Sequence, residues 1–352
     1  MSLIRMSSPH THSQNQSAKV MQWVLLALVP GILANCFFFG YGVLINLAWA
    51  NAIALGSEAL VLKLRNRPIQ YYLKDYSAIV TAFLLALAIP PTAPWWLTLI
   101  GCSFAIIIGK QLYGGLGYNP FNPAMLGYVL LLISFPVEMT TWLSPKGIEG
   151  NLATPSLIDS LSFWFPAIGS NTVDSFTGAT PLDVVKTNTS LTLLELWQQT
   201  PLLEGYAGVG WTWVNLAFLA GGIFLLVKKV FTWHAPVAML AALFVMSLLF
   251  YGGEGSDSHG GPLFHLLSGA TMLGAFFIVT DPVSSATSKK GRIVFGASIG
   301  VLTYIIRAWG GYPDGVAFAV LLMNMAAPTI DYYTQPRTYG HKKPNRGLAK
   351  SD

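Results

Sequence analysis

The sequence predicts an all-α integral membrane protein of about ten transmembrane helices in two inverted repeats, with one long loop outside the membrane. Hydrophobic residues fill 53% of its 352 positions and charged residues only 10%, whereas about a quarter of the residues in a soluble domain are charged. The apolar runs approach the length of one bilayer crossing and do not alternate as barrel strands do. This composition excludes an ordinary soluble domain.

Ten apolar runs are candidate crossings, and several are shorter than the roughly 20 residues that a spanning helix needs. The short runs carry proline or glycine near their ends, which is typical of broken or tilted helices. The runs cover residues 20–39, 41–62, 77–89, 97–113, 124–143, 208–227, 235–251, 264–280, 293–309 and 316–330. We therefore expect crossings one to five within residues 20–143 and crossings six to ten within residues 207–331.

The distribution of lysine and arginine sets the expected orientation in the membrane, which in a Gram-negative cell would be the inner membrane. With the amino terminus inside, 17 of the 20 basic residues fall at the cytoplasmic face, which leaves only Lys146, Lys186 and Arg307 for the other face. This is a strong positive-inside bias. It predicts a cytoplasmic tail at 1–19, a basic cytoplasmic tail at 332–352 and a periplasmic loop at 144–206.

The formal charge of +5 could suggest an anionic partner such as nucleic acid. The basic residues, however, lie in short clusters beside apolar runs, which indicates topology and contact with the lipid bilayer. The polar segment 1–19 also lacks the pattern of a cleaved signal peptide. We expect no nucleic-acid partner and an uncleaved first helix.

An internal repeat relates the two halves. Residues 81–84 lead to Pro90, a glycine-containing helix and Gly114-Gly115; residues 274–277 lead to Pro282, a similar helix and Gly310-Gly311. The copies begin at crossings three and eight, and an odd offset of five places them in the membrane with opposite orientation. Residues 117–123 and 310–315 are then interruptions that could build a central site, or ordinary interhelical turns.

The long loop carries the one segment with chemistry of its own, residues 174–180 (DSFTGAT). A threonine hydroxyl needs a base to become a nucleophile, and the loop contains no histidine. Thr180 is therefore better suited to accept a group that another enzyme attaches, with Gly178 and Ala179 leaving the backbone open to close approach. The alternative is a hydroxyl-rich turn capped by Asp174, or a helix start before Leu182.

Residues 174–180 resemble the recognition motif of covalently flavinylated membrane electron carriers, in which FMN is esterified through its phosphate to the final threonine. Residues 268–272, 280–284 and 307–319 are similar to the family that contains the D-type subunit of Rnf complexes and the B-type subunit of Na⁺-translocating NADH:quinone reductases. The resemblance spans essentially all ten crossings. The short polar amino-terminal segment makes the chain more similar to the Rnf branch.

The resemblance implies that Thr180 carries covalent FMN and that Asp174, Thr177, Gly178 and Ala179 form the recognition sequence of a flavin transferase. It further implies a non-covalent riboflavin among the helices, for which the segment near Asn119 and Asn122 could supply polar anchors. The expected partners are other subunits of an Rnf-type complex. Such a complex is a translocase that couples electron transfer between NADH and ferredoxin to Na⁺ or H⁺ movement.

A second Ser-Gly-Ala-Thr core ends at Thr271, but His265 stands where the motif has its leading aspartate. Helix packing by small residues is therefore the better interpretation there. Cys36 and Cys102 lie in apolar runs without a C-x-x-C pair, as core residues do. No metal-ligand spacing, P-loop or Rossmann pattern occurs, so we expect no metal site and no NADH binding by this chain itself.

Three intramembrane ionisable residues, Glu58, Lys110 and Arg307, are candidates for coupling electron transfer to cation movement. Snorkelling or helix pairing is the alternative for all three. Asp281, directly before Pro282, is expected to cap a loop. Two other functions share these features: a small-solute or ion channel or transporter built on the same inverted-repeat scaffold, and a purely structural role.

Overall fold

The computed structural model describes residues 15–148, 155–164, 176–253, 255, 258–336 and 340. Helices account for most of these residues, and the two strands that occur among them are two residues long each. The predicted all-α class is confirmed.

The two halves of the chain each contribute a group of membrane helices, and a group of short elements lies between them. The first half comprises α1 (Asn15–Phe39), α2 (Gly42–Leu64), α3 (Ile69–Leu73), α4 (Ser77–Ala88), α5 (Trp95–Phe104), the π-helix η1 (Ala105–Gln111) and α6 (Pro123–Ser134). The second comprises α11 (Trp211–Val227), α12 (His234–Leu249), α13 (Pro262–Leu267), α14 (Thr271–Leu273), the π-helix η4 (Gly274–Ile278), α15 (Lys289–Trp309) and α16 (Val316–Thr334).

The loop between the halves is organised by short elements. In chain order these are α7 (Pro136–Thr140), β1 (Trp142–Leu143), α8 (Leu157–Ser162), β2 (Thr177–Gly178), α9 (Pro181–Thr187), α10 (Leu193–Gln199) and the 3₁₀ turn η3 (Pro201–Leu203). Leu182, Val185, Leu193, Leu196 and Leu203 bury a small apolar cluster under this loop. The same cluster includes Phe264 of α13, so the described part of the loop packs onto the second repeat.

Apolar helices match the expected crossings. Four, namely α1 from Ser17 together with α2, α15 and α16, are long and apolar enough to span a membrane, and five shorter apolar helical stretches accompany them among the described residues. The remaining expected crossing, 264–280, is divided among α13, α14 and η4. The chain is thus a multi-pass membrane protein with several half-length helices, such as α4 with 12 residues.

The fifth crossing ends earlier than the sequence predicts. We expected it to reach residue 143, whereas α6 ends at Ser134. Pro136 is the cause: a residue before proline is pushed out of the α region, and Phe135 has φ −135° and ψ 61°. The following residues form α7 and then β1, which pairs in antiparallel fashion with β2 through Trp142 opposite Gly178 and Leu143 opposite Thr177.

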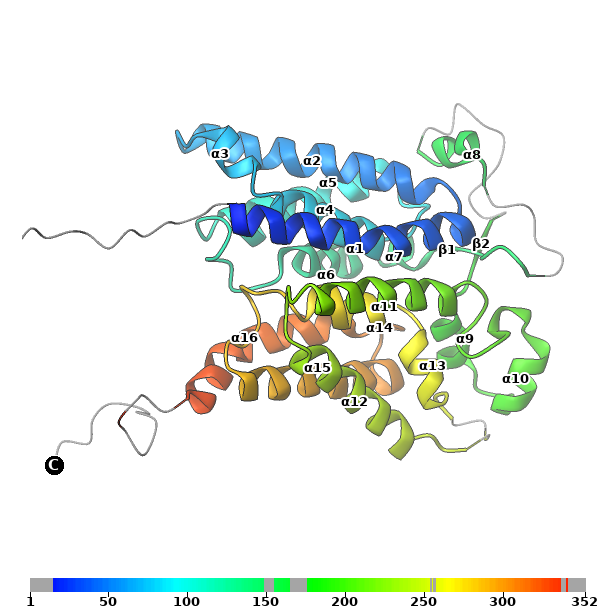
Figure 1. Ribbon diagram of the computed structural model, residues 1–352. Coiled ribbons are helices and arrows are strands. Elements are labelled where there is room, and N and C mark those ends of the chain that lie inside the picture. Colours follow the sequence, from blue (N-terminus) through cyan, green and yellow to red (C-terminus); the bar gives the residue numbers. More distant parts are fainter. Residues whose placement is uncertain are drawn as a thin grey trace, which may run out of the picture.

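The arrangement of the helices follows the predicted repeat (Figure 1). Helix α2 packs on α4 and α5, α12 packs on α13 and α15, and α1 packs on α11 between the two groups. Ser77 at the start of α4 and Thr280 after η4 line one cavity, whereas Ala88 at the end of α4 and Leu273 of α14 line another. The two segments therefore run in opposite directions, as inverted repeats require.

Small residues allow α1 and α11 to pack closely. A Cβ atom added at Gly221 would collide with the backbone oxygen of Ala27, and one added at Gly31 would collide with the ring of Phe218. Close backbone approach at glycine is a typical device of membrane helix packing, where lipid removes the usual hydrophobic driving force between helices.

Figure 1 shows where the ends of the chain lie relative to the loop. The start of α1, the short helix α3 and the end of α16 lie at one end of the helical bundle, on the left of the view. Helices α8, α9 and α10 lie at the opposite end. We call these the inner and the outer end of the bundle.

Candidate functional site

The strand β2 delivers Thr180 to the outer end of the bundle. The N–H of Ser144, directly after β1, donates to the oxygen of Phe176 at 2.9 Å, which continues the pairing of the strands. A Cβ atom added at Gly178 would lie 2.5 Å from the hydroxyl oxygen of Ser144, so a larger residue there would have to displace this hydroxyl. Ala179 is exposed and Thr180 is half-buried, so the hydroxyl lies beside open backbone. Asp174 lies outside the described residues.

Thr180 is the N-cap of α9 and forms a capping box with Asp183. The Oγ1 hydroxyl of Thr180 donates to Oδ2 of Asp183 at 2.7 Å and accepts from the N–H of Asp183 at 3.2 Å. The N–H of Thr180 also donates to Oδ2 at 3.3 Å. Such reciprocal bonds satisfy donors that a helix start otherwise leaves open. The predicted helix start is therefore present. An ester at this oxygen would lose the bond donated to Oδ2 of Asp183 but could still accept from the N–H of Asp183.

Lys186 anchors α9 to the membrane helices. Its ammonium donates to the backbone oxygens of Ile306 at 3.1 Å and Tyr312 at 2.6 Å, which belong to the end of α15 and the turn after it. The oxygen of Ile306 also accepts from the N–H of Gly310 at 2.9 Å, so Lys186 adds a second donor to the end of α15. Burial lowers the pKa of Lys186, while the Asp183 carboxylate acts in the opposite direction. The acceptor helix is thus fixed to the second repeat.

A small cavity of about 80 Å³ lies beneath Thr180. It is bounded by residues of both repeats and of α9, among them Tyr128, Asp183, Leu273 and Asp314. A cavity of this size holds a few water molecules. We call it the outer cavity.

The second Ser-Gly-Ala-Thr core interrupts crossing eight beside the outer cavity. Gly269 adopts φ +55°, and a Cβ atom there would collide with Asp314 and crowd Leu182 of α9. The hydroxyl of Thr271 is buried and donates to the oxygens of His265 and Ser268. This hydroxyl is enclosed within the helix break, which fits the packing role that the sequence predicts for Thr271.

Arg307 stabilises the same break, so it pairs within the protein and does not snorkel. Its guanidinium donates to the oxygen of His265 at 2.8 Å and to Oγ1 of Thr271 at 2.9 Å. It also pairs with Asp314 at 3.0 Å. The planar group has enough donors to hold several acceptors at once.

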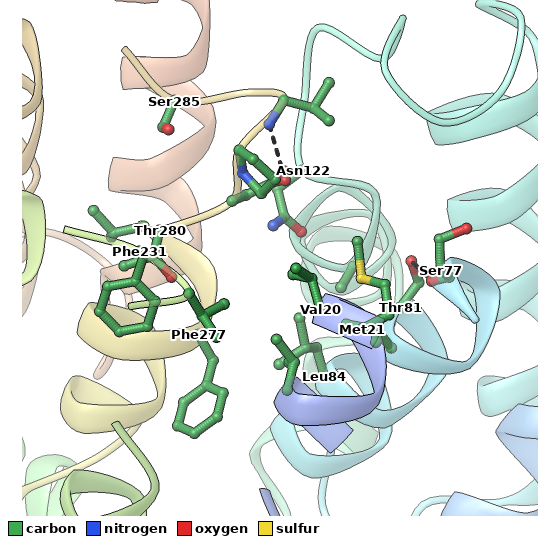
Figure 2. A pocket seen from close by; sticks show the side chains of 18 of the residues that line it. Val20, Met21, Ser77, Thr81, Leu84, Asn122, Phe231, Phe277, Thr280 and Ser285 are labelled. Atoms are coloured by element: carbon green, nitrogen blue, oxygen red, sulfur yellow. Dashed lines mark hydrogen bonds between the residues drawn. The ribbon is translucent and has the colours of Figure 1, made fainter. Parts of the chain in front are cut away.

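A larger cavity opens toward the inner end of the bundle (Figure 2). It has a volume of about 680 Å³, and Figure 2 shows Leu84 of α4 on one side and Phe277 of η4 on the other, with Asn122 above both in the view. Asn119 also lines it, and the Oδ1 atom of Asn119 is buried without a hydrogen-bond partner. We call it the inner cavity; it brings together both asparagines that the sequence singled out.

A buried polar cluster adjoins the inner cavity. Lys110 donates to Oε1 of Glu58 at 2.7 Å and to the hydroxyl of Ser77 at 2.6 Å, and Gln111 also donates to Glu58 at 2.7 Å. Glu58 and Lys110 are each at most 2% exposed. The two predicted intramembrane charges therefore form a helix-to-helix pair, and Lys110 reaches the cavity wall.

Asp281 caps the loop after η4, as predicted. Its carboxylate accepts from the N–H of Val283 at 3.2 Å and from the hydroxyl of Ser284 at 2.6 Å. Cys102 is buried and Cys36 half-buried, and both are free thiols. These positions agree with the core role that the sequence predicts for the cysteines.

Two uncharged residues complete the helix breaks, and the sequence reasoning missed both. Asn215 of α11 donates to the oxygens of Leu267 and Gly269 and accepts from the N–H of Met272. Asn324 of α16 joins Asn122 to Ser284. The sequence signal that could have found them is an asparagine inside an apolar run. A buried side-chain amide is costly without hydrogen-bond partners, so such an asparagine is expected to bond to another helix.

Comparison with known proteins identifies the family. The model of the NQR2, RnfD, RnfE family matches residues 4–340. The chain belongs to this family. The family resemblance that residues 268–272, 280–284 and 307–319 indicated is therefore confirmed.

Members of this family share most of the sequence with the chain. A protein of Ectopseudomonas mendocina (strain ymp) is 62% identical over 348 residues, covering 99% of both chains, and one of Pseudomonas aeruginosa (strain UCBPP-PA14) is 60% identical over the whole length of both. A protein of Vibrio vulnificus (strain YJ016) is 56% identical over 360 aligned positions, which cover 97% of this chain and 100% of the relative. Each relative is named as the D-type subunit of an ion-translocating oxidoreductase complex.

Proposed function

We propose that this chain is the D-type subunit of an Rnf-type ion-translocating oxidoreductase complex and carries electrons through FMN esterified to Thr180. The family and the names of the relatives support the assignment to the complex. The observation that carries the flavin assignment is the position of Thr180, which ends the DSFTGAT segment at the outer end of the bundle. Such a complex would couple electron transfer between NADH and ferredoxin to Na⁺ or H⁺ movement.

The residues around Thr180 fit a phosphate ester. The hydroxyl is half-buried and follows the exposed Ala179, so a transferase can approach it from outside. The outer cavity of about 80 Å³ is too small for a three-ring flavin, because ligand sites usually span 300–1,000 Å³. The ring would lie outside this cavity, where Lys186 keeps the acceptor helix in place.

In this proposal the flavin supplies the redox chemistry, and the protein supplies position and surroundings. The β1–β2 pairing fixes the segment before Thr180, and the capping box fixes the orientation of its hydroxyl. The positive-inside distribution supports an inner-membrane orientation with both termini cytoplasmic and the flavin loop periplasmic. The proposed partners are the other subunits and a flavin transferase that reads Asp174, Thr177, Gly178 and Ala179.

The inner cavity fits the expected non-covalent riboflavin. Its volume of about 680 Å³ lies in the range of ligand sites. Phe231 and Phe277 offer aromatic surface, while Asn119 and Asn122 offer polar groups. The unpartnered Oδ1 atom of Asn119 is an acceptor that a flavin N–H could satisfy.

The two cavities also support a cation pathway along the interface of the repeats. Leu84 and Phe277 line the inner cavity, and Leu87 and Leu273 line the outer cavity. These pairs lie only about one turn apart on α4 and on the segment α14–η4. A thin layer of apolar side chains therefore separates the cavities, as in pores that close by a hydrophobic constriction.

The flavin assignment is tested by denaturing gel electrophoresis of the protein made together with its transferase. We expect ultraviolet-excited yellow-green fluorescence in the band of the wild-type protein and none with Thr180→Ala. Thr192→Ala is the matched control, since Thr192 caps α10 through the same kind of capping box. A wild-type protein with only its bare mass at Thr180 would contradict the assignment and favour the channel or the purely structural role.

The pathway is tested separately in sealed vesicles. Phe277→Ala removes a large side chain from the apolar layer between the inner and outer cavities. We therefore expect a higher passive cation leak, while flavin stays attached at Thr180. An unchanged leak in a correctly folded variant would place the pathway elsewhere. A selective leak in wild-type protein without any flavin would favour the channel interpretation instead.

A further inference from the structure

The hydroxyl proton of Thr180 points at one carboxylate. Its Oγ1 donates to Oδ2 of Asp183 at 2.7 Å, a short distance typical of a charge-assisted hydrogen bond. Oγ1 also accepts from the N–H of Asp183 at 3.2 Å, which leaves one lone pair of the oxygen open. The oxygen therefore has its proton directed inward and a lone pair left for bond formation.

Among the residues that the structure describes, Asp183 is the one carboxylate near Thr180 that is available to take this proton. It makes no ion pair with any residue that the structure describes. Asp314, which shares the outer cavity, is engaged by Arg307 and by the N–H of Ala270. The ammonium of Lys186 donates to the backbone oxygens of Ile306 and Tyr312 and not to Asp183. The loop has no histidine to act in its place.

We propose that Asp183 is the general base for its own chain's flavinylation, accepting the proton of Thr180 as the ester forms. This inference rests on the proposed function. The co-reactant is a flavin nucleotide whose phosphate is joined to a second nucleotide by a phosphoanhydride bond. Oγ1 of Thr180 bonds to the flavin phosphorus, and the phosphoanhydride bond breaks. The second nucleotide leaves with the bond's electron pair, and the hydroxyl proton moves to Oδ2 of Asp183. No electrons are exchanged with an oxidant or reductant.

A base is needed because a threonine hydroxyl is a weak nucleophile at neutral pH. A hydrogen-bonded base in the reacting geometry typically contributes about 10²–10⁴-fold to the rate. The carboxylate is already within hydrogen-bond reach before the transferase binds. The substrate protein thereby supplies part of the chemistry of its own modification.

The capping box alone does not make an acceptor, because the same loop contains two others. Ser156 with Asp159 caps α8, and Thr192 with Glu195 caps α10. Thr180 differs in following the Thr-Gly-Ala segment and in being fixed to the second repeat through Lys186. Thr192 and Glu195 therefore provide a matched control with the same bonds and no recognition sequence.

The experiment measures flavin incorporation into full-length protein that was made without transferase. The purified protein receives transferase and the flavin dinucleotide FAD, and intact mass and in-gel fluorescence follow the ester with time. Asp183→Asn keeps an oxygen for the cap but cannot take a proton, so we expect attachment to slow by about 100-fold or more. Asp183→Glu should recover part of the rate, and Glu195→Gln should match the wild type.

The pH dependence of the attachment rate distinguishes a general base at Asp183 from a residue that only caps α9. The wild-type rate should fall as acid protonates the carboxylate, and the rate of Asp183→Asn should lack this fall. Protection of α9 from hydrogen exchange checks that the variant is folded. The inference would be overturned if Asp183→Asn attached flavin at the wild-type rate. It would also be overturned if Asp183→Asn were slower but kept the wild-type pH profile and Asp183→Glu recovered none of the rate. Either result would leave the flavin assignment intact. Wild-type protein that accepts no flavin would instead remove the proposed function.

Discussion

The side chain of Asn324 accepts a hydrogen bond from the backbone N–H of Asn122 at 3.0 Å, although 202 residues separate the two in the chain. The Nδ2 group of Asn324 donates to the oxygen of Ser284 at 3.0 Å. Asn122 caps α6 of the first repeat, and Ser284 lies in the loop after η4 of the second. One amide thus joins the two inner helix breaks beside the inner cavity.

Asn324→Ala is expected to destabilise the protein and loosen the inner cavity. The substitution leaves the buried N–H of Asn122 and the oxygen of Ser284 without this partner, which costs about 1–3 kcal/mol. Asn51→Ala is the control, since Asn51 bonds only within α2, to the oxygen of Leu47. The measurement is unfolding in mild detergent with increasing denaturant. An equal effect of both substitutions would contradict the bridging role of Asn324.

Replacing one member of the Glu58–Lys110 pair is expected to lower the free energy of unfolding more than replacing both. Lys110→Met leaves a buried carboxylate with only Gln111 as partner, and loss of one member of a buried pair costs about 3–5 kcal/mol. The double variant Glu58→Gln with Lys110→Met should recover part of the loss. A double-mutant cycle of unfolding free energies measures the coupling. Additive effects would show that the pair is energetically independent.

The same variants test coupling to ion movement. If the pair senses charge beside the inner cavity, Glu58→Gln should lower ion transport by the assembled complex in vesicles without lowering the flavin content. Lys63, which is exposed at the end of α2 and does not line the inner cavity, offers a control as Lys63→Gln. Transport at the wild-type level in folded Glu58→Gln and Lys110→Met proteins would remove both residues from the coupling hypothesis.

Arg307→Lys is expected to loosen the break at Ser268-Gly269-Ala270-Thr271. Lysine lacks the planar fork that reaches His265, Thr271 and Asp314 together. Loss of hydrogen bonds to a charged group costs about 1.5–3 kcal/mol. Hydrogen exchange in residues 264–275, followed by mass spectrometry, should rise well above that of the wild type. Unchanged exchange would show that Asn215 suffices to hold the break.

Acid is expected to fray the start of α10. Hydrogen bonds from the backbone and side chain of Thr192 lower the pKa of Glu195. A lowered carboxyl pKa contributes stability above its unfolded value of about 4.3, and this contribution is lost as pH falls through the folded value. Protection factors of residues 192–199, which correct for the slower intrinsic exchange of amides in acid, should therefore fall with acidification in the wild type. Glu195→Gln should remove this dependence; a persisting dependence would assign it to another group.

Local patterns in the sequence predicted most of the scaffold. Apolar runs predicted the helices, and Pro282 and Gly310-Gly311 marked ends that the structure confirms. The boundaries failed where local backbone chemistry competes with hydropathy: Pro136 ends α6 early, and Gly269 breaks crossing eight. Hydropathy counts apolar residues, whereas these breaks depend on the φ and ψ of single residues.

The candidate site was predictable where it is contiguous. Residues 174–180 indicated Thr180, and the Thr-x-x-Asp spacing to Asp183 is a typical capping sequence. The partners that act across the fold could not be found in this way. Lys186 reaches residues 120 and 126 positions away, and the spacing of residues along the chain says nothing about such contacts.

The sequence by itself determined the membrane class and the two repeats; it also predicts an orientation from lysine and arginine and singles out the threonine that ends the motif. Only the tertiary structure decided that Glu58 pairs with Lys110, that Arg307 holds a helix break, and that Asn324 joins both repeats. The physical reason is that covalent order and hydropathy are local properties. A buried polar group instead takes whichever partner the packed helices bring within hydrogen-bond distance.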